Sequence, residues 1–150
     1  MSVQVRFARP EEAPGLLHAF EWLFAPPGSR PPSWEPARAR AVLAEVTAAE
    51  DSAVLVAEAP DGSLAGICTV YRDIRSVRYG DRAWVEDLAV DPGRRSQGVG
   101  KALLDAAKDW AREHGATHLE LDSSTTRSDA HRFYEREQPT WRSLCYAWKL

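Results

Sequence analysis

The chain has 150 residues, 44% of them hydrophobic and 27% charged, which is the composition of a single globular domain spanning residues 1–150. It lacks the run of roughly 20 apolar residues that a membrane span needs and the apolar core of a secretion signal, so we expect no membrane partner. The net charge of −3 argues against a nucleic-acid partner. Two cysteines cannot form a disulfide framework, so we expect a cytoplasmic protein, and the excess of arginine over lysine is typical of a GC-rich bacterial genome.

Hydrophobic periodicity, prolines and glycines predict the secondary structure. In chain order we expect a strand at 3–7, helices at 10–24 and 34–49, strands at 53–57, 64–71 and 83–90, a helix at 98–114, a strand at 118–121, a helix at 128–136 and a strand at 141–150. This order, βααβββαβαβ, predicts an α/β fold with a mixed, mostly antiparallel sheet flanked by helices. A stiff loop with four prolines, residues 25–32, is either a pocket wall or a plain connector.

One stretch, residues 83–101 (AWVEDLAVDPGRRSQGVGK), combines a strand, a short basic loop and a helix that glycines open. The first turn of a helix offers unpaired backbone N–H groups and a partial positive charge. Gly98 and Gly100 have no Cβ, so a phosphate can approach their backbone closely. Positive charge comes from Arg94, Arg95 and Lys101. The stretch therefore predicts a pyrophosphate-binding site.

Three ligand classes use such sites. A P-loop for nucleoside triphosphates needs a glycine where this chain has Arg95 and a serine or threonine where it has Ala102. A dinucleotide fingerprint needs glycine or alanine where Leu103 stands, which argues against a nucleotide-binding oxidoreductase. Coenzyme A is the third class.

Three segments resemble one known family. Arg95-Ser96-Gln97-Gly98-Val99-Gly100 matches the Arg/Gln-x-x-Gly-x-Gly/Ala signature of the GCN5-related N-acetyltransferases (GNAT). Leu88-Ala89-Val90-Asp91-Pro92 resembles the segment that precedes this signature, and Ala130-His131-Arg132-Phe133-Tyr134-Glu135 resembles a later helix that carries a tyrosine. The order of predicted elements fits the family over nearly the whole chain, which implies a single-domain GNAT fold.

The resemblance implies acetyl-CoA as co-substrate. The strand before the signature would separate from its neighbour, and the pantetheine arm would lie along the backbones of Leu88, Ala89 and Val90. The pyrophosphate would be held by the amides of Arg95, Ser96, Gln97, Gly98, Val99, Gly100 and Lys101. Tyr134 would stand near the thioester sulfur and protonate the departing thiolate, because a phenol with a pKa near ~10 is protonated at pH 7. The alternative is that Phe133 and Tyr134 only pack their helix.

Acetyl transfer also requires a neutral acceptor amine, and Glu86 is our first candidate for the base. Strict alternation would place Glu86 on one face of its strand, with Trp84, Leu88 and Val90, and Asp87 on the other. Glu86 could instead bind a cationic substrate without moving its proton, or pair with an arginine. Asp87 and Glu120 are the reserve candidates.

Other polar groups carry weaker signals. We expect no metal site, because Gly115 ends the helix between His114 and His118 and removes their common face. Cys68 and Cys145 have the pattern of small core residues rather than nucleophiles. Two tryptophans, Trp22 and Trp34, flank the proline loop and could line the acceptor pocket.

Two segments depart from the family pattern. Arg127 stands where the family often has an asparagine, and Glu137-Gln138-Pro139 replaces a usual Leu-Gly-Phe. The path of the last strand is therefore open. Because that strand would carry apolar residues on one face and is poorly suited to a bare sheet edge, we expect a homodimer that uses it.

The sequence thus predicts an N-acetyltransferase that moves the acetyl group of acetyl-CoA directly to a primary amine. A small cationic amine is the first candidate acceptor, since Glu86, Asp87 and the negative net charge suit it. The alternatives are a protein lysine or N-terminus as acceptor, and a non-catalytic module that binds acyl-CoA.

Overall fold

The computed structural model describes residues 2–150, and Met1 lies outside them. Its centre is one sheet with the strand order β1-β2-β3-β4-β5. The strands are β1 (Gln4–Phe7), β2 (Ser52–Glu58), β3 (Leu64–Ser76), β4 (Gly80–Val90) and β5 (His118–Glu120). The first four pair antiparallel, whereas β4 and β5 pair parallel. The predicted α/β class with a mixed, mostly antiparallel sheet is confirmed.

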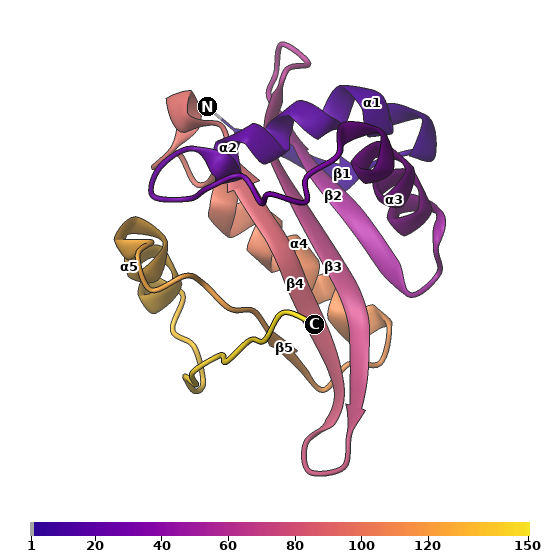
Figure 1. Ribbon diagram of the computed structural model, residues 1–150. Helices are drawn as coiled ribbons and strands as arrows, with labels where there is room; N and C mark the ends of the chain where they lie inside the picture. Colours follow the sequence, from indigo (N-terminus) through magenta and orange to yellow (C-terminus); the bar gives the residue numbers. More distant parts are fainter. Residues whose placement is uncertain (1) are drawn as a thin grey trace.

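Helices cover both faces of this sheet (Figure 1). They are η1 (Pro10–Glu12), α1 (Ala13–Leu16), η2 (Leu17–Phe20), α2 (Glu21–Phe24), α3 (Pro36–Ala48), η3 (Pro92–Arg94), α4 (Val99–Glu113) and α5 (Ser128–Arg136). The helix α4 packs on one face and the segment from η1 to α3 on the other. None of the helices within residues 2–150 is long and apolar enough to cross a membrane.

The strand β2 shows why the sheet has two cores. Its side chains are buried on both faces, since residues alternate between them with a period of two. Leu55 packs in the cluster that α4 covers, together with Leu103 and Trp110. Val54 and Val56 pack in the second cluster, beneath the N-terminal helices. A strand that is apolar on both faces fixes the middle layer of a three-layer domain.

The helix that we expected at 10–24 is instead a chain of short α and 3₁₀ turns. Pro14 and Gly15 lie inside it, and proline removes a hydrogen-bond donor while glycine lowers helix propensity. The second helix begins at Pro36, two residues later than expected, because the Glu35 carboxylate caps it by accepting hydrogen bonds from the amides of Ala37 and Arg38.

The final strand expected at 141–150 is absent: these residues form no helix or strand, so the sheet has five strands rather than six. Gln138 has a positive φ of 56° and Pro139 follows it, which turns the chain away from α5. The side chains of Leu144, Tyr146, Trp148 and Leu150 are exposed. In Figure 1 this C-terminal segment crosses in front of the sheet and ends near β4.

Candidate active site

The strands β4 and β5 separate soon after they pair. Their ladder joins only Arg82, Ala83 and Trp84 to residues 118–120. From Val85 to Val90, β4 has no strand partner on this side, and α5 stands apart from it (Figure 1). The other edge of β4 is paired with β3 as far as Val90. The backbone of residues 85–90 is therefore a free edge that an extended ligand can join by main-chain hydrogen bonds.

This free edge leads directly into the N-terminus of α4. Asp91 ends the strand, η3 follows, and residues 95–98 are exposed. Gly98 is the N-cap of α4 and has a φ of +83°, a left-handed conformation that other residues adopt only with strain. The first intrahelical hydrogen bond runs from the amide of Ala102 to the carbonyl of Gly98. The amides before Ala102 remain available for an anion.

Gly100 lies where the first turn of α4 meets α5. A Cβ at Gly100 would lie 3.4 Å from the ring of Phe133, which is an ordinary van der Waals distance. The first turn of α4 therefore packs against Phe133. The ring of Phe133 lies 5.2 Å from that of Tyr134, so this contact also places the tyrosine.

The positive charges near this turn are unequal. Arg95 is exposed and forms no ion pair within residues 2–150. Lys101 pairs instead with Asp105 at 2.8 Å and with Glu137 at 3.4 Å. Arg94 donates a hydrogen bond to Ser63 at 2.5 Å and pairs with Asp91. Of the three predicted cations, Arg95 is the one left without an acidic partner.

Tyr134 is partly buried on α5. Burial, together with the nearby Cys68 and Asp122, raises the pKa of its hydroxyl to about 12, although the charge of Arg127 opposes the rise. The hydroxyl therefore keeps its proton at neutral pH. Burial also raises the pKa of the Cys68 thiol to about 12, so this cysteine is not a nucleophile.

The expected alternation of β4 side chains is wrong, because the strand contains a bulge at Glu86. Thr69 of β3 lies opposite Asp87, and the next β3 residue, Val70, lies opposite Val85, so Glu86 is an extra residue. Before the bulge Val85 faces the α4 core, and after it Leu88 does. Asp87 consequently lies on the face of the sheet that the N-terminal helices cover.

The two neighbouring carboxylates have different surroundings. Glu86 is exposed and accepts a hydrogen bond from the indole N–H of Trp84 at 2.7 Å. Asp87 is partly buried, and its carboxylate accepts a hydrogen bond from the Thr69 hydroxyl at 2.6 Å. Burial raises the pKa of Asp87, the hydrogen bond from Thr69 opposes this, and the charge of Glu86 adds to the rise.

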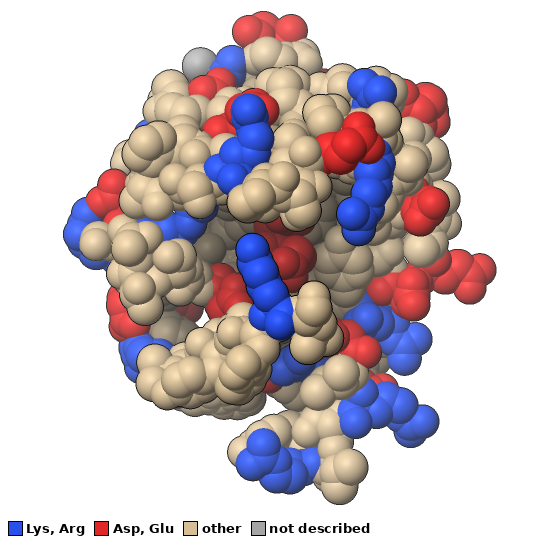
Figure 2. Space-filling view, in the orientation of Figure 1, with Lys and Arg blue, Asp and Glu red and all other residues tan. Residues whose placement is uncertain are grey.

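Asp87 lines a cavity of about 270 Å³ between the sheet and the N-terminal helices, which we call the acceptor cleft. Its other lining residues include Phe20, Trp34, Thr69 and Tyr71. Figure 2 shows acidic side chains recessed in the hollow at the centre of this face. Trp34 is one of the residues that line this cavity.

Trp22, the other tryptophan beside the proline loop, is not part of this lining; its ring packs against His18 at 5.6 Å. Sequence reasoning missed Thr69 and Tyr71. They come from the interior of a hairpin strand, and no local motif marks them.

Arg127, which replaces the family's asparagine, joins two distant segments. Its guanidinium donates a hydrogen bond to the carbonyl of Leu23 at 2.8 Å, across 104 residues of sequence. A Cβ at Gly28 would lie 2.5 Å from the same guanidinium and 1.9 Å from the Leu23 carbonyl oxygen. Gly28, in the proline loop, therefore makes room for a hydrogen bond that joins α2 to the N-cap of α5.

The remaining candidates are engaged elsewhere. Glu120 pairs with Arg82 at 3.6 Å and with His118 at 3.0 Å, so it is not a free base. Within residues 2–150, no group of three or more histidine, cysteine, aspartate or glutamate side chains could hold a metal ion.

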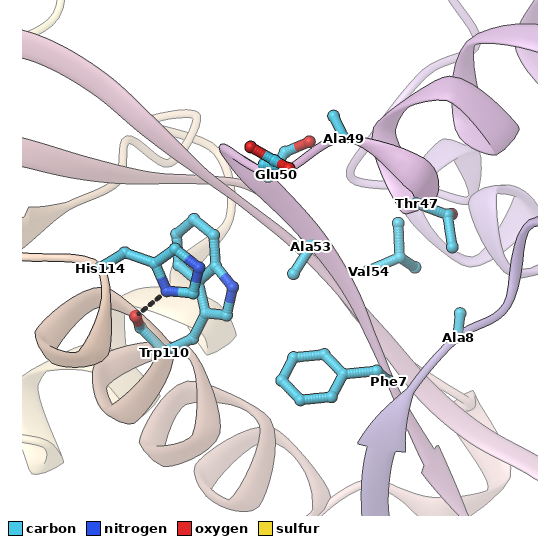
Figure 3. Close-up of a pocket in the computed structure, with 10 residues that line it drawn as sticks. Phe7, Ala8, Thr47, Ala49, Glu50, Ala53, Val54, Trp110 and His114 are labelled. Atoms are coloured by element: carbon cyan, nitrogen blue, oxygen red, sulfur yellow. Dashed lines mark hydrogen bonds between the residues drawn. The ribbon is translucent and has the colours of Figure 1, made fainter.

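A second hollow, of about 360 Å³, lies at the C-terminal end of α4 (Figure 3). Phe7, Glu50, Trp110 and His114 line it, at the C-terminal end of α4. Trp110 is 12 residues beyond Gly98, which corresponds to about 18 Å along a helix. His114 stacks on the indole of Trp110 at 4.1 Å and is hydrogen-bonded to its carbonyl at 2.8 Å.

The comparisons with known proteins identify the family of this chain, in which a mixed sheet splits beside a helix with a glycine N-cap. The profile of the acetyltransferase (GNAT) family matches residues 16–138. The chain belongs to this family. The expected resemblance is confirmed.

Relatives of known sequence carry acetyltransferase names. Streptothricin acetyltransferase of Streptomyces lavendulae is 38% identical over 86 residues, which cover 57% of this chain and 43% of that protein. Aminoglycoside N(6')-acetyltransferase type 1 of Klebsiella aerogenes is 42% identical over 82 residues, which cover 53% of this chain and 54% of that protein. The matched segments thus span about half of these relatives' lengths.

Solved structures share the fold. AAC(6')-Iy in complex with the bisubstrate analogue CoA-S-monomethyl-acetylneamine superposes with a TM-score of 0.81, at 19% identity over the whole of both chains. An aminoglycoside acetyltransferase from a soil metagenome, meta-AAC0020 in complex with sisomicin, gives a TM-score of 0.75 at 18% identity, over 99% of this chain and 95% of that one.

Proposed function

We propose that this protein transfers the acetyl group of acetyl-CoA directly to a primary amine of a small cationic molecule. The observation that carries the proposal is the free edge of β4, which leads through η3 and the exposed residues 95–98 into the N-terminus of α4. An extended arm that ends in a pyrophosphate fits such a path, because main-chain groups bind the arm and helix amides bind the anion.

The residues that would hold acetyl-CoA follow from this path. The backbones of Leu88, Ala89 and Val90 would bind the pantetheine arm. The pyrophosphate would be bound by the segment Arg95–Lys101, mainly through its amides and the unpaired charge of Arg95. When bound, acetyl-CoA supplies an activated acetyl thioester.

Side chains of the protein would then transfer two protons. A new bond forms between the amine nitrogen and the acetyl carbon, and the carbon–sulfur bond breaks. Glu86 takes the proton that the amine loses, directly or through water, and the Tyr134 hydroxyl gives a proton to the sulfur. The high pKa of Tyr134 suits this role, because the hydroxyl is protonated before every turnover. The Cys68 thiol is buried and keeps its proton, and the carboxylate of Asp122 raises the pKa of the exposed Cys145, which favours direct transfer over a covalent intermediate.

The acceptor cleft favours a small molecule over a protein lysine or N-terminus. Its lining is aromatic and acidic on the sheet side, and its volume is about 270 Å³. The relatives' names point the same way, because streptothricin and aminoglycosides are small molecules with several amino groups. A non-catalytic binding module would not need Tyr134 and Glu86 beside the free edge.

We also propose that the protein works in the cytoplasm as a homodimer. Within residues 2–150, the C-terminal segment pairs with no strand, and its apolar side chains Leu144, Tyr146, Trp148 and Leu150 are exposed. A second copy can cover them. Measurement of the molecular mass in solution tests this, and a monomer at micromolar concentration would refute it.

The direct test of the activity is CoA release from acetyl-CoA in the presence of a panel of amines, namely diamines, aminoglycosides, amino-acid amides and lysine peptides. Acetyl-CoA, but not NAD, should raise the melting temperature. We expect CoA release with small cationic amines. Preference for the lysine peptides would favour the alternative acceptor, and thermal stabilisation without CoA release from any amine would favour the binding module.

A further inference from the structure

Asp87 is a charged group of the acceptor cleft that the two proton transfers do not use. The bulge at Glu86 turns it into the layer between the sheet and α3, where it lines the cleft. Thr69 fixes its orientation, because the hydroxyl donates to one carboxylate oxygen at 2.6 Å and accepts from the Asp87 amide at 3.0 Å. The other carboxylate oxygen is free of this hydrogen bond.

No cation of residues 2–150 pairs with Asp87. Arg38 also lines the cleft, but it is exposed on α3, beside the carboxylate of Glu35, and forms no ion pair with Asp87. A partly buried carboxylate without a partner is costly, which is why burial raises the pKa of Asp87. A ligand that brings a positive charge would remove this cost.

The aromatic residues of the cleft suit the same charge. Phe20, Trp34 and Tyr71 line it together with Asp87. Aromatic faces attract ammonium groups and also bury short alkyl chains. An alkylammonium group therefore matches both the carboxylate and the walls.

We propose that Asp87 is a specificity-determining residue that binds a second ammonium group of the acceptor, so that the preferred substrates are compact diamines or polyamines. The inference rests on the proposed function. The amine that attacks the thioester must be neutral. The cation that neutralises Asp87 must remain charged, so it is a different amino group of the same molecule. Glu86, exposed on the neighbouring position, serves the reacting amine.

The test compares 1,4-diaminobutane with butylamine, which has the same carbon chain and one ammonium group fewer. We expect the wild-type kcat/KM for the diamine to exceed that for butylamine by at least about tenfold, the value of one hydrogen bond to a charged group. Asp87→Asn should raise the KM for the diamine about 10- to 100-fold. It should leave the KM values for butylamine and acetyl-CoA unchanged. The control is Asp109→Asn, which removes the same charge from an exposed position on α4 and should keep the preference.

A binding measurement accompanies the kinetics. Calorimetric titration with 1,4-diaminobutane, without acetyl-CoA, should detect binding to the wild type and to Asp109→Asn but not to a folded Asp87→Asn. Equal use of the diamine and butylamine by the wild type would overturn the inference and leave the proposed function intact. A drop in kcat/KM by the same factor for both amines in Asp87→Asn would also overturn it. Absence of CoA release with any amine would overturn the proposed function and this inference together.

Discussion

Two hollows formed by residues 2–150 have similar sizes, but their polar groups differ. The acceptor cleft measures about 270 Å³ and the hollow at the C-terminal end of α4 about 360 Å³. In the larger hollow, three polar side chains have partners within the fold and Glu50 is exposed to solvent: the hydroxyls of Thr47 and Ser52 donate to the carbonyls of Leu43 and Val46, and the His114 ring is bonded to its own helix.

The acceptor cleft differs because its neighbourhood contains unsatisfied groups. Asp87 has no cation within residues 2–150, and β4 has a free edge beyond Trp84. Volume alone therefore does not locate a site in this fold. Unpaired backbone groups and a carboxylate without a cation do locate a site, because a ligand that hydrogen-bonds or neutralises them gains binding free energy.

The largest expected effect comes from the helix N-terminus on the reactive side. Gly98→Asp brings a negative charge and a side chain to a φ of +83°, so we expect acetyl-CoA affinity to fall about 10³-fold, or about 4.2 kcal/mol. Calorimetric titration with acetyl-CoA measures this.

The matched control is Gly115→Asp, at the other end of the same helix. Gly115 has a φ of +80°, and a Cβ added there would meet no atom within 4 Å, as is also true of Gly98. Both variants should lose stability, but only Gly98→Asp should lose affinity. Wild-type affinity for acetyl-CoA in a folded Gly98→Asp protein would show that the N-terminus of α4 does not bind the coenzyme.

The next effect concerns Tyr134. Tyr134→Phe keeps the ring beside Phe133 and removes the hydroxyl, so kcat should fall about 10- to 10³-fold with little change in acetyl-CoA affinity. Because burial raises the pKa of this hydroxyl to about 12, the wild-type rate should rise with pH as the amine loses its proton and should show no decline below about pH 10. Steady-state kinetics from pH 6 to 10 give both results. Full turnover in Tyr134→Phe would show that water, and not Tyr134, supplies the proton to the thiolate sulfur.

A smaller, mixed effect is expected for Glu86. Glu86→Gln removes a base and a negative charge, so kcat should fall and the KM for a cationic amine should rise, each about tenfold. The rate of the variant should recover at higher pH, where more amine is neutral. Glu120→Gln is the control, because its carboxylate is paired with Arg82 and His118, and its pH profile should match the wild type. An unchanged pH profile of the rate in Glu86→Gln would show that another group acts as the base.

The smallest effect is expected in the larger hollow. Glu50→Gln and His114→Ala change its lining but touch neither the free edge nor Asp87. We expect kcat and both KM values to stay within about twofold of the wild type, since neither residue contacts the reacting groups. A tenfold change in any of these constants would show that the larger hollow takes part in the reaction and would contradict the distinction between the two hollows.

The stretch from Ala83 to Lys101 could be predicted because its information is local. A strand, a turn and a glycine N-cap follow one another within 19 residues, and each depends on its neighbours in sequence. The same holds for the end of α4, where Gly115 adopts the expected left-handed conformation.

Other parts depend on contacts between distant segments. The bulge at Glu86 arises from the pairing of β4 with β3, so the sequence of β4 alone does not reveal which face Asp87 takes. The prediction of a last strand was wrong for a related reason. Residues 141–150 alternate as a strand does, but they pair with no strand within residues 2–150, because strand formation depends on contacts with another segment as well as on alternation. In the sequence, Arg127 is only a departure from the family pattern. Its structural role depends on its contacts with Leu23 and Gly28, which are distant in sequence.

The free edge of β4 also bears on aggregation. An unpaired strand edge is a template for any extended chain, including another copy of this protein. Residues 85–90 expose such an edge, and the uncovered side chains of the C-terminal segment add apolar surface nearby. Between turnovers, CoA or acetyl-CoA would therefore also protect the fold, by occupying the place where a foreign strand would otherwise attach.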